Sequence, residues 1–286
     1  MQNNLTGDDL FSYIILLRSG PTAKKYLLCE GDSDCAVLDP HIEEDVCETI
    51  PGYGKNSVLD AIKIVSQQNM NDVAALLDRD WQKDNSGLPD VAVTTDHYDI
   101  DATVFYAGDT CKRVVAAFCD RNIVRNFLRE GDWSSPVEVA TALAFPVGVL
   151  RKLNHEEGWG LRFSDTPFSE VALPSSGGVD LTKTVASALS RSKQPRVTEQ
   201  EIPRIVSSAQ RAMEKAQDPH SFCCGHDLNS ALAYLMFSKW STRINRKTLE
   251  RAMRAAFSCS EISSTTMFAD IPPALKCSSA ELFTCA

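Results

Sequence analysis

The sequence predicts an α/β protein with a mostly parallel sheet and flanking helices in its first part and a mainly α-helical C-terminal region. Up to about residue 101, short apolar runs alternate with helical patterns, which is typical of a parallel sheet. Beyond that point apolar residues recur at helical spacing, without further strand-like runs. The 286 residues are 43% hydrophobic and 23% charged, enough for one large folded domain or two smaller ones.

Each predicted strand is a compact apolar run that ends at a turn. The predicted strands are residues 25–29, 46–50, 73–77 and 91–94. Helical periodicity and N-cap residues predict helices at 8–18, 34–38, 57–67, 103–107, 112–129, 136–152, 182–191, 199–216, 226–240 and 246–257. We therefore expect an α/β domain over residues 1–133 and a mostly helical domain over 134–286.

Charge is distributed unevenly along the chain. Residues 1–110 carry 20 acidic and 7 basic side chains, whereas residues 111–286 carry 18 and 22. We therefore expect cation ligands in the first part and contacts with a phosphate backbone in the second. The polar N-terminus and the lack of a long apolar run indicate a cytoplasmic protein with no membrane segment.

The ten cysteines show no metal-type CxxC pairs, so we expect them to be reduced thiols. Cys223 and Cys224, with His226 nearby, could bind a metal. Adjacent cysteines rarely form a good tetrahedral pair, so structural thiols are the favoured interpretation.

Acidic residues follow three of the predicted strands. Glu30 follows the first, Asp78 and Asp80 follow the third, and the fourth is followed by Asp96, Asp99 and Asp101. The carboxyl ends of parallel strands lie at one edge of a sheet, and residues i and i+2 of an extended segment share a face.

Carboxylates held that close together need a cation, and magnesium prefers oxygen ligands. The sequence therefore predicts a site for one or two Mg²⁺ ions, suited to phosphodiester chemistry. The alternative for each acid is a helix cap or a solvated turn. This simpler role is the expected one for Asp32, Asp34, Asp96 and Asp99.

Together these motifs resemble the TOPRIM domain of primases, topoisomerases and OLD-type nucleases. The matching segments are YLLCEGDSD at residues 26–34 and LLDRDW at 76–81. TTDHYDID at 94–101 is similar to the DUF4435 branch, and GHDL at 225–228 resembles the GKDLL segment of that branch. This branch includes the nuclease subunit of the PARIS anti-phage system, which works beside an ABC-type ATPase.

The resemblance implies that Glu30, Asp78 and Asp80 are the principal metal ligands, with Glu30 also a general acid or base. Asp101 stands where the branch has Glu and would contact a second metal. His226 stands where the branch has Lys and could stabilise transition-state charge only when protonated. Its simpler role is a residue at a helix start. Mg²⁺ is the implied cofactor, and Mn²⁺ is an alternative.

Basic residues mark a candidate nucleic-acid surface. Lys55, in a turn, could contact a phosphate or be a solvated lysine. A second set of residues, later in the chain, has helical spacing and could follow a phosphate backbone, with its tryptophan stacking on a base. This set consists of Trp240, Arg243, Arg246, Lys247, Arg251 and Arg254. The alternatives are a solvated cationic helix face and a tryptophan in the core.

The resemblance implies a toxic effector that cleaves RNA, with tRNA as the substrate known for the family. Such an effector would be held silent by a separate ABC-type ATPase and could be a homodimer when active. The chain has no GxxxxGK[ST] motif, so the ATPase would be another chain. The alternatives are a non-catalytic TOPRIM-like interaction module, a DNA-directed OLD-like nuclease, and a primase-like or topoisomerase-like enzyme.

Overall fold

The computed structural model describes residues 6–20, 24–82, 86–173 and 177–285. It forms two compact units. The sheet unit comprises residues 1–107 and 257–286, and the helical unit comprises residues 108–256. The expected boundary after residue 133 therefore lies inside the helical unit. The expected division also assigned the C-terminal segment to the helices, whereas this segment belongs with the sheet.

The sheet has four parallel strands: β1 (Lys25–Cys29), β2 (Cys47–Pro51), β3 (Val73–Leu77) and β4 (Ala92–Thr94). Their order is β2-β1-β3-β4, which confirms the predicted parallel α/β architecture. The chain adds β2 on one side of β1 and then β3 on the other. The carboxyl ends of β1 and β3 therefore form a topological switch point, the place where open α/β sheets bind ligands.

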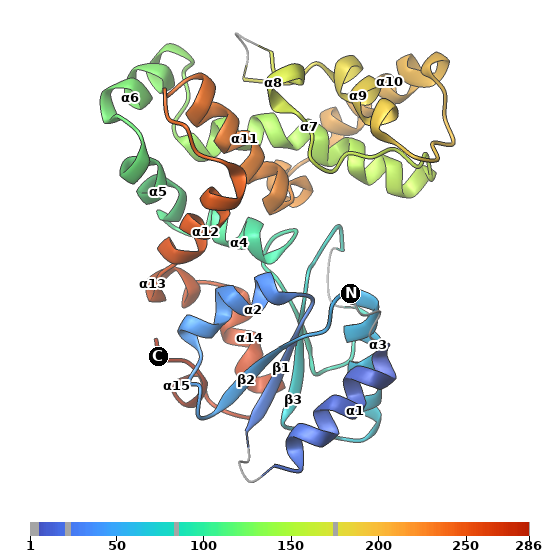
Figure 1. The fold of residues 1–286 in the computed structure, drawn as a ribbon, viewed down its shortest axis with the longest axis vertical. Coiled ribbons are helices and arrows are strands. Elements are labelled where there is room, and N and C mark those ends of the chain that lie inside the picture. Colours follow the sequence, from blue (N-terminus) through green and yellow to red (C-terminus); the bar gives the residue numbers. More distant parts are fainter. Residues whose placement is uncertain (1–5, 21–23, 83–85, 174–176, 286) are drawn as a thin grey trace. The chain divides into compact units, whose positions relative to one another are not determined.

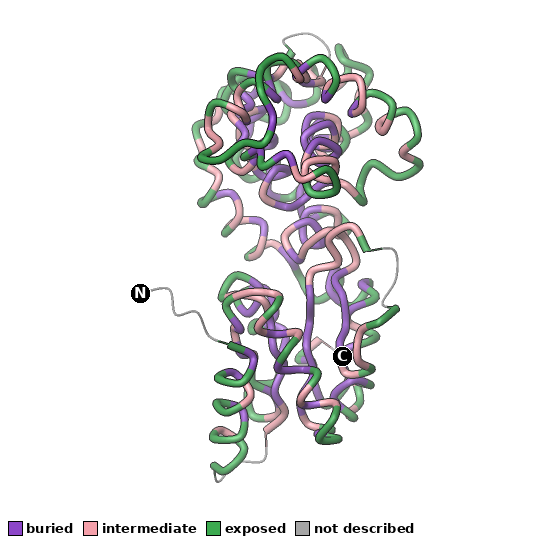
Figure 2. The backbone as a smooth tube through the Cα atoms, turned by 90° about the vertical axis from the view of Figure 1, so that its right-hand side faces the viewer, coloured by how far each residue is buried: buried purple, intermediate pink, exposed green. Residues whose placement is uncertain are grey.

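Helices cover both faces of this sheet. Figure 1 shows α1 (Gly7–Arg18) and α3 (Lys55–Gln67) on one side, and α2 (Asp32–Leu38) and α14 (Thr266–Ala274) on the other. All five residues of β3 are buried, as expected for a strand covered on both faces. Figure 2 shows the same burial along the strands, with exposed outer surfaces on the helices. Each fully buried Leu or Ile stabilises the fold by about 1.5–3 kcal/mol.

Hydrogen bonds from backbone N–H groups to a side chain connect the C-terminal segment to the sheet. Asp96 follows β4 and accepts hydrogen bonds from the backbone N–H groups of Thr266 at 2.6 Å and Met267 at 3.2 Å. It thereby caps the start of α14, which confirms its expected role as a cap. The shorter elements of this unit are η1 (Asp39–His41), α4 (Ile100–Tyr106), α13 (Cys259–Ile262) and α15 (Ser279–Leu282).

In the helical unit, α7 (Pro136–Glu157) packs against α5, α9, α10 and α11. The helices of this unit are α5 (Thr110–Phe118), α6 (Arg121–Glu130), α7, α8 (Phe168–Val171), α9 (Leu181–Arg191), α10 (Ile202–Lys215), α11 (Gly225–Ser238) and α12 (Arg246–Ala256), with short turns η2 (Glu199–Glu201) and η3 (Pro219–Phe222). None of the helices in the described ranges is long and apolar enough to cross a membrane.

The helix predicted over residues 112–129 is instead two helices. The Asp120 side chain accepts hydrogen bonds from the N–H groups of Asn122 at 2.8 Å and Ile123 at 3.1 Å. An N-cap of this kind begins a new helix, so the chain turns between α5 and α6. Apolar residues on both sides keep a helical spacing, which is why the sequence pattern concealed the break.

Candidate active site

Glu30 and Asp78 meet at the switch point of the sheet. Glu30 follows β1, and its Oε1 accepts a hydrogen bond of 2.9 Å from the backbone N–H of Asp78, which follows β3. Only 17% of the Glu30 side chain is exposed. The carboxylate after β1 is therefore tied to the backbone of the first residue after β3.

One ammonium group lies among these acids. The Nζ of Lys55 is 2.5 Å from the Asp80 Oδ2, 2.5 Å from the backbone carbonyl oxygen of Asp78, and 4.0 Å from the Glu30 Oε1. A single positive centre thus contacts groups that follow both strands. The sequence left Lys55 either at a substrate phosphate or solvated in a turn, whereas the structure places its ammonium group among the carboxylates.

The start of α3 positions this lysine. Gly54 precedes Lys55, and its N–H donates a hydrogen bond of 2.8 Å to the carbonyl oxygen of Glu30. Its φ of +137° is a backbone conformation that glycine adopts without strain. The turn after β2 is thereby fixed to the end of β1, and the first residue of α3 faces the acids.

Asp80 reaches the cluster by a different route from the expected one. We expected Asp78 and Asp80 to share a face through strand alternation, but β3 ends at Leu77. Asp80 has a left-handed φ of +52°, which aspartate tolerates better than most residues. Its N–H donates a 2.8 Å hydrogen bond to the carbonyl oxygen of Tyr98. A tight turn, not an extended segment, therefore directs its carboxylate to Lys55.

Glu30 and Asp78 hold protons more strongly than ordinary carboxyls. Burial raises the pKa of Asp78 to about 9, and the negative charges of Asp99 and Glu30 add to this. Burial also raises the pKa of Glu30 to about 7, although the hydrogen bond from Asp78 and the charge of Lys55 act in the opposite direction. In the structure the oxygens of Glu30, Asp78 and Asp80 do not all lie within 4.8 Å of one another. A divalent cation with carboxylate and water ligands would therefore have to displace Lys55 and draw them closer.

Asp99 has a second effect in addition to the helix cap that the sequence predicted. Its Oδ1 accepts a 2.6 Å hydrogen bond from the Ala102 N–H, which confirms the expected helix cap. It is also the charge that raises the pKa of Asp78 most. Asp101, the expected ligand of a second metal, lies in the first turn of α4. Because a cap at the end of β4 lies at the same edge as Asp78, the strand pattern could have indicated Asp99.

His226 lies in the helical unit, near the start of α11. Arg246 Nη1 is 2.7 Å from His226 Nε2 and 2.7 Å from Asp165 Oδ1. A guanidinium can only donate, so the imidazole nitrogen accepts this bond. The same Nε2 lies 3.2 Å from Asp165 Oδ1, so His226 belongs to a polar cluster with Arg246 and Asp165 inside the helical unit.

The next residue, Asp227, has a structural partner. Only 1% of its side chain is exposed, and it accepts two hydrogen bonds from Arg151, of 2.7 and 3.0 Å. The segment that resembles GKDLL forms the start of α11. Its aspartate joins α11 to α7 through a buried ion pair with Arg151.

Only part of the basic set predicted between Trp240 and Arg254 lies on an exposed surface. Trp240 is 1% exposed, so it belongs to the core and cannot stack on a base. Arg243 precedes α12, and its guanidinium lies 5.9 Å from the ring centre of Phe237. Arg246 pairs with Asp165 and with Glu250. Lys247 and Arg251 are exposed on α12.

A second basic surface was missed by the sequence interpretation. A groove of about 530 Å³ lies along α5 and α6, with Val115, Val124 and Leu128 among its apolar lining. Its exposed cationic residues are Lys112, Arg121, Arg125 and Arg129. The arginines recur every four residues along α6, which places them on one side of a helix. That spacing was readable in the sequence.

The cysteines differ from expectation at one place. Cys259 and Cys285 form a disulfide, so the expectation of ten reduced thiols is wrong for this pair. The remaining eight are free. Cys223 and Cys224 are buried, and within the described ranges only His41, Cys259 and Cys285 form a group of three histidine, cysteine or acidic residues close enough to hold a metal.

Comparison with protein-family models gives no match for this sequence, and no curated protein matches it.

Proposed function

We propose that this chain is a metal-dependent nuclease of TOPRIM type, in which Glu30, Asp78 and Asp80 hold Mg²⁺ or Mn²⁺. The observation that supports the proposal is the shared cation. Lys55 already contacts the carboxylates of Glu30 and Asp80, yet the pKa of Asp78 is still raised to about 9. A bound divalent cation would polarise a phosphodiester and lower the pKa of a water ligand.

The side chains of the site have separable roles in this proposal. Glu30 has a pKa of about 7, which suits proton transfer at neutral pH. Lys55 neutralises the acids in the metal-free protein and donates to a substrate phosphate once a metal replaces it. Asp99 adds negative charge beside Asp78. We assign no catalytic role to His226, because its imidazole is paired with Arg246 and Asp165 of the helical unit.

RNA is the favoured substrate, and the cellular role is that of a toxic effector in anti-phage defence. The support for this role is the resemblance of the 26–34, 76–81 and 94–101 segments to the DUF4435 branch. That resemblance also supports a separate ABC-type ATPase as regulator and a homodimer as the active form. The basic groove along α5 and α6 is suited to a polyanion.

Cleavage assays on RNA and DNA, with Mg²⁺ and with a chelator, test the proposal. We expect RNA cleavage that needs the metal and falls at least about 100-fold in Glu30→Gln, the range for loss of a general acid or base. Glu48→Gln makes the same chemical change on an exposed position of β2 and should leave the rate unchanged. Preferential cleavage of DNA would favour the OLD-like alternative.

A metal-binding assay distinguishes a chain that has no metal site from a chain whose metal site is intact but whose cleavage activity is held off by a regulator. Calorimetric titration with Mg²⁺ should show binding to the wild type and a large loss of affinity in Asp78→Asn. If the wild type neither cleaves nucleic acid nor binds Mg²⁺ or Mn²⁺, the nuclease proposal is wrong and the chain is a non-catalytic interaction module.

A further inference from the structure

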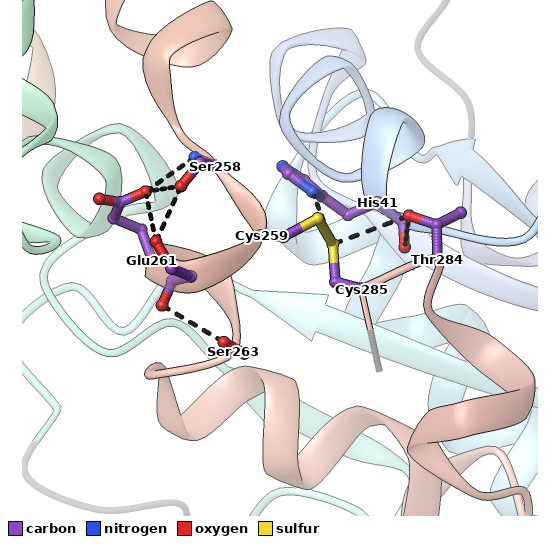
Figure 3. The surroundings of a disulfide bond; sticks show 8 residues. His41, Ser258, Cys259, Glu261, Ser263, Thr284 and Cys285 are labelled. Atoms are coloured by element: carbon purple, nitrogen blue, oxygen red, sulfur yellow. Dashed lines mark hydrogen bonds between the residues drawn. A yellow bond between two sulfur atoms is a disulfide. The ribbon is translucent and has the colours of Figure 1, made fainter.

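A second group of potential ligands lies in the sheet unit, built from residues that the carboxylate site does not use. His41 lies at the end of η1, Cys259 begins α13, and Cys285 follows α15. One ligand atom from each residue lies within 4.8 Å of the others. Figure 3 shows the His41 ring directed at the two sulfur atoms.

The imidazole has the environment of a metal ligand. His41 is 5% exposed, and its Nδ1 is 3.4 Å from the Cys285 Sγ. The imidazole also hydrogen-bonds the backbone of Phe257, while burial lowers its pKa. Metal-bound histidines commonly use one ring nitrogen for the metal and the other for a backbone carbonyl. A neutral, oriented imidazole beside two sulfurs is a suitable donor set for a borderline-soft cation.

Backbone contacts hold this arrangement in place. Residues 42 and 283 form an isolated antiparallel bridge, and the N–H of Thr284 donates to the His41 carbonyl oxygen at 2.9 Å. Cys285 is therefore held near His41 by its own neighbours, independently of the bond to Cys259. The His41 ring also hydrogen-bonds the backbone of Phe257, two residues before Cys259, so the three donors would stay close to one another if the disulfide were reduced.

We propose that His41, Cys259 and Cys285 bind Zn²⁺ when the disulfide is reduced, so that the disulfide and the zinc complex are alternative states of one site. In a tetrahedral zinc site, sulfur and nitrogen ligands lie roughly 3.5–3.8 Å apart, given bonds of about 2.3 Å and 2.0–2.1 Å. The His41–Cys285 distance of 3.4 Å is close to this value. Three protein ligands leave a fourth position for water or an added thiol.

The exchange between the two states balances chemically. Two molecules of a small thiol reduce the Cys259–Cys285 bond, supplying two electrons and two protons, and become a small-molecule disulfide. Zn²⁺ then binds the two cysteine sulfurs as thiolates and releases their two protons. Either state ties the C-terminal segment to the start of α13 and to η1. The site takes thiolate and imidazole ligands, so its preference differs from that of the carboxylate cluster.

Titration of the full-length chain with Zn²⁺ tests this proposal. Protein reduced anaerobically should bind one more equivalent than oxidised protein, measured by competition with a chromophoric chelator. Co²⁺ should give a thiolate charge-transfer band in the reduced wild type. Cys259→Ser should lose both signals, and His41→Asn should weaken binding by about 10-fold or more.

Cys277→Ser is the matched control, because Cys277 is a partly exposed free thiol of the same unit. It should bind like the wild type. Equal zinc binding by oxidised and reduced wild type would overturn the proposal, and so would unchanged binding in Cys259→Ser. The comparison of two redox states of one chain does not depend on whether any variant folds.

Discussion

The ammonium nitrogen of Lys55 lies 2.5 Å from a carboxylate oxygen of Asp80, and this pair links the start of α3 to the turn after β3. About a fifth of the lysine side chain is exposed, so the interaction is only partly screened by water. Because the same nitrogen is 4.0 Å from Glu30, the lysine occupies the place where a divalent cation would contact these acids. Lysine and metal are therefore expected to compete.

Lys55→Met should strengthen Mg²⁺ binding. Two unit charges 4 Å apart interact by about 4 kcal/mol at an effective dielectric of 20, and part of this repulsion between lysine and metal disappears with the ammonium. We expect about tenfold tighter binding, equivalent to about 1.4 kcal/mol, by calorimetry. The cleavage rate should fall if Lys55 also contacts substrate. Weaker Mg²⁺ binding in this variant would mean instead that the lysine holds the acids in position.

The stability of the metal-free protein should fall as pH rises. The pKa is about 7 for Glu30 against an ordinary 4.5, and about 9 for Asp78 against 3.8. A carboxyl with a raised folded-state pKa contributes stability that is complete below its ordinary pKa and is lost as pH rises through the folded value. The free energy of unfolding should therefore decrease between roughly pH 4 and pH 9.

Denaturant unfolding at several pH values measures this trend. Asp78→Asn should flatten it, because the amide does not titrate. Added Mg²⁺ should stabilise the wild type by about 2.7 kcal/mol at a free concentration of 100 times its Kd. At a fixed Mg²⁺ concentration the stabilisation should be larger at high pH, because the Kd falls as the acids lose their protons. A pH-independent wild type, or equal flattening in Glu48→Gln, would contradict the assignment.

Local patterns were sufficient for the strands and for the edge where the acids gather. Val73–Leu77 was predicted with the observed bounds, because an unbroken apolar run between polar residues has few alternatives in a parallel sheet. Glu30 and Asp78 were found because strand ends determine which residues share an edge. Contacts through space were not readable in the same way. The position of Lys55 depends on the hydrogen bond between the Gly54 N–H and the Glu30 carbonyl oxygen, and no local sequence pattern predicts that bond.

The C-terminal segment shows the same limit. Residues after Cys259 gave no clear pattern, yet they form three helices, one of which covers a face of the sheet. Their placement depends on bonds such as Asp96 to Thr266, whose partners are 170 residues apart. The Cys259–Cys285 disulfide follows from the same return of the chain. A spacing argument based on neighbouring cysteines could not have identified it.

Asp99→Asn and Asp101→Asn form a matched pair that separates two possible ligands. Asn is as good an N-cap as Asp, so Asp99→Asn should leave α4 intact. Since Asp99 is the charge that most raises the pKa of Asp78, its loss should lower that pKa and weaken divalent-cation binding. Asp101→Asn should have a smaller effect on the Mg²⁺ Kd. The reverse order would restore Asp101 as the acid beside the metal.

Arg151→Met should destabilise the helical unit by about 3–5 kcal/mol, because it leaves the buried charge of Asp227 without its partner. Arg204→Ala breaks an exposed pair with Glu201 and should cost less than about 1 kcal/mol. Guanidinium unfolding monitored by circular dichroism compares the two. A loss in Arg151→Met no larger than that in Arg204→Ala would show that the Asp227 pair contributes little to stability.

The groove along α5 and α6 should contribute more to RNA binding than the exposed basic residues of α12. Arg121 and Arg125 line the groove, whereas Lys247 and Arg251 lie on α12. Both pairs are changed to Ala in a Glu30→Gln background, which prevents cleavage, and binding to single-stranded RNA is measured by fluorescence anisotropy at several salt concentrations. Each lost phosphate contact should reduce the slope of log K against log salt by about 0.7. We expect the larger reduction for the α6 pair. A larger reduction for the α12 pair would mean that the nucleic acid binds along α12, the helix that the sequence first indicated.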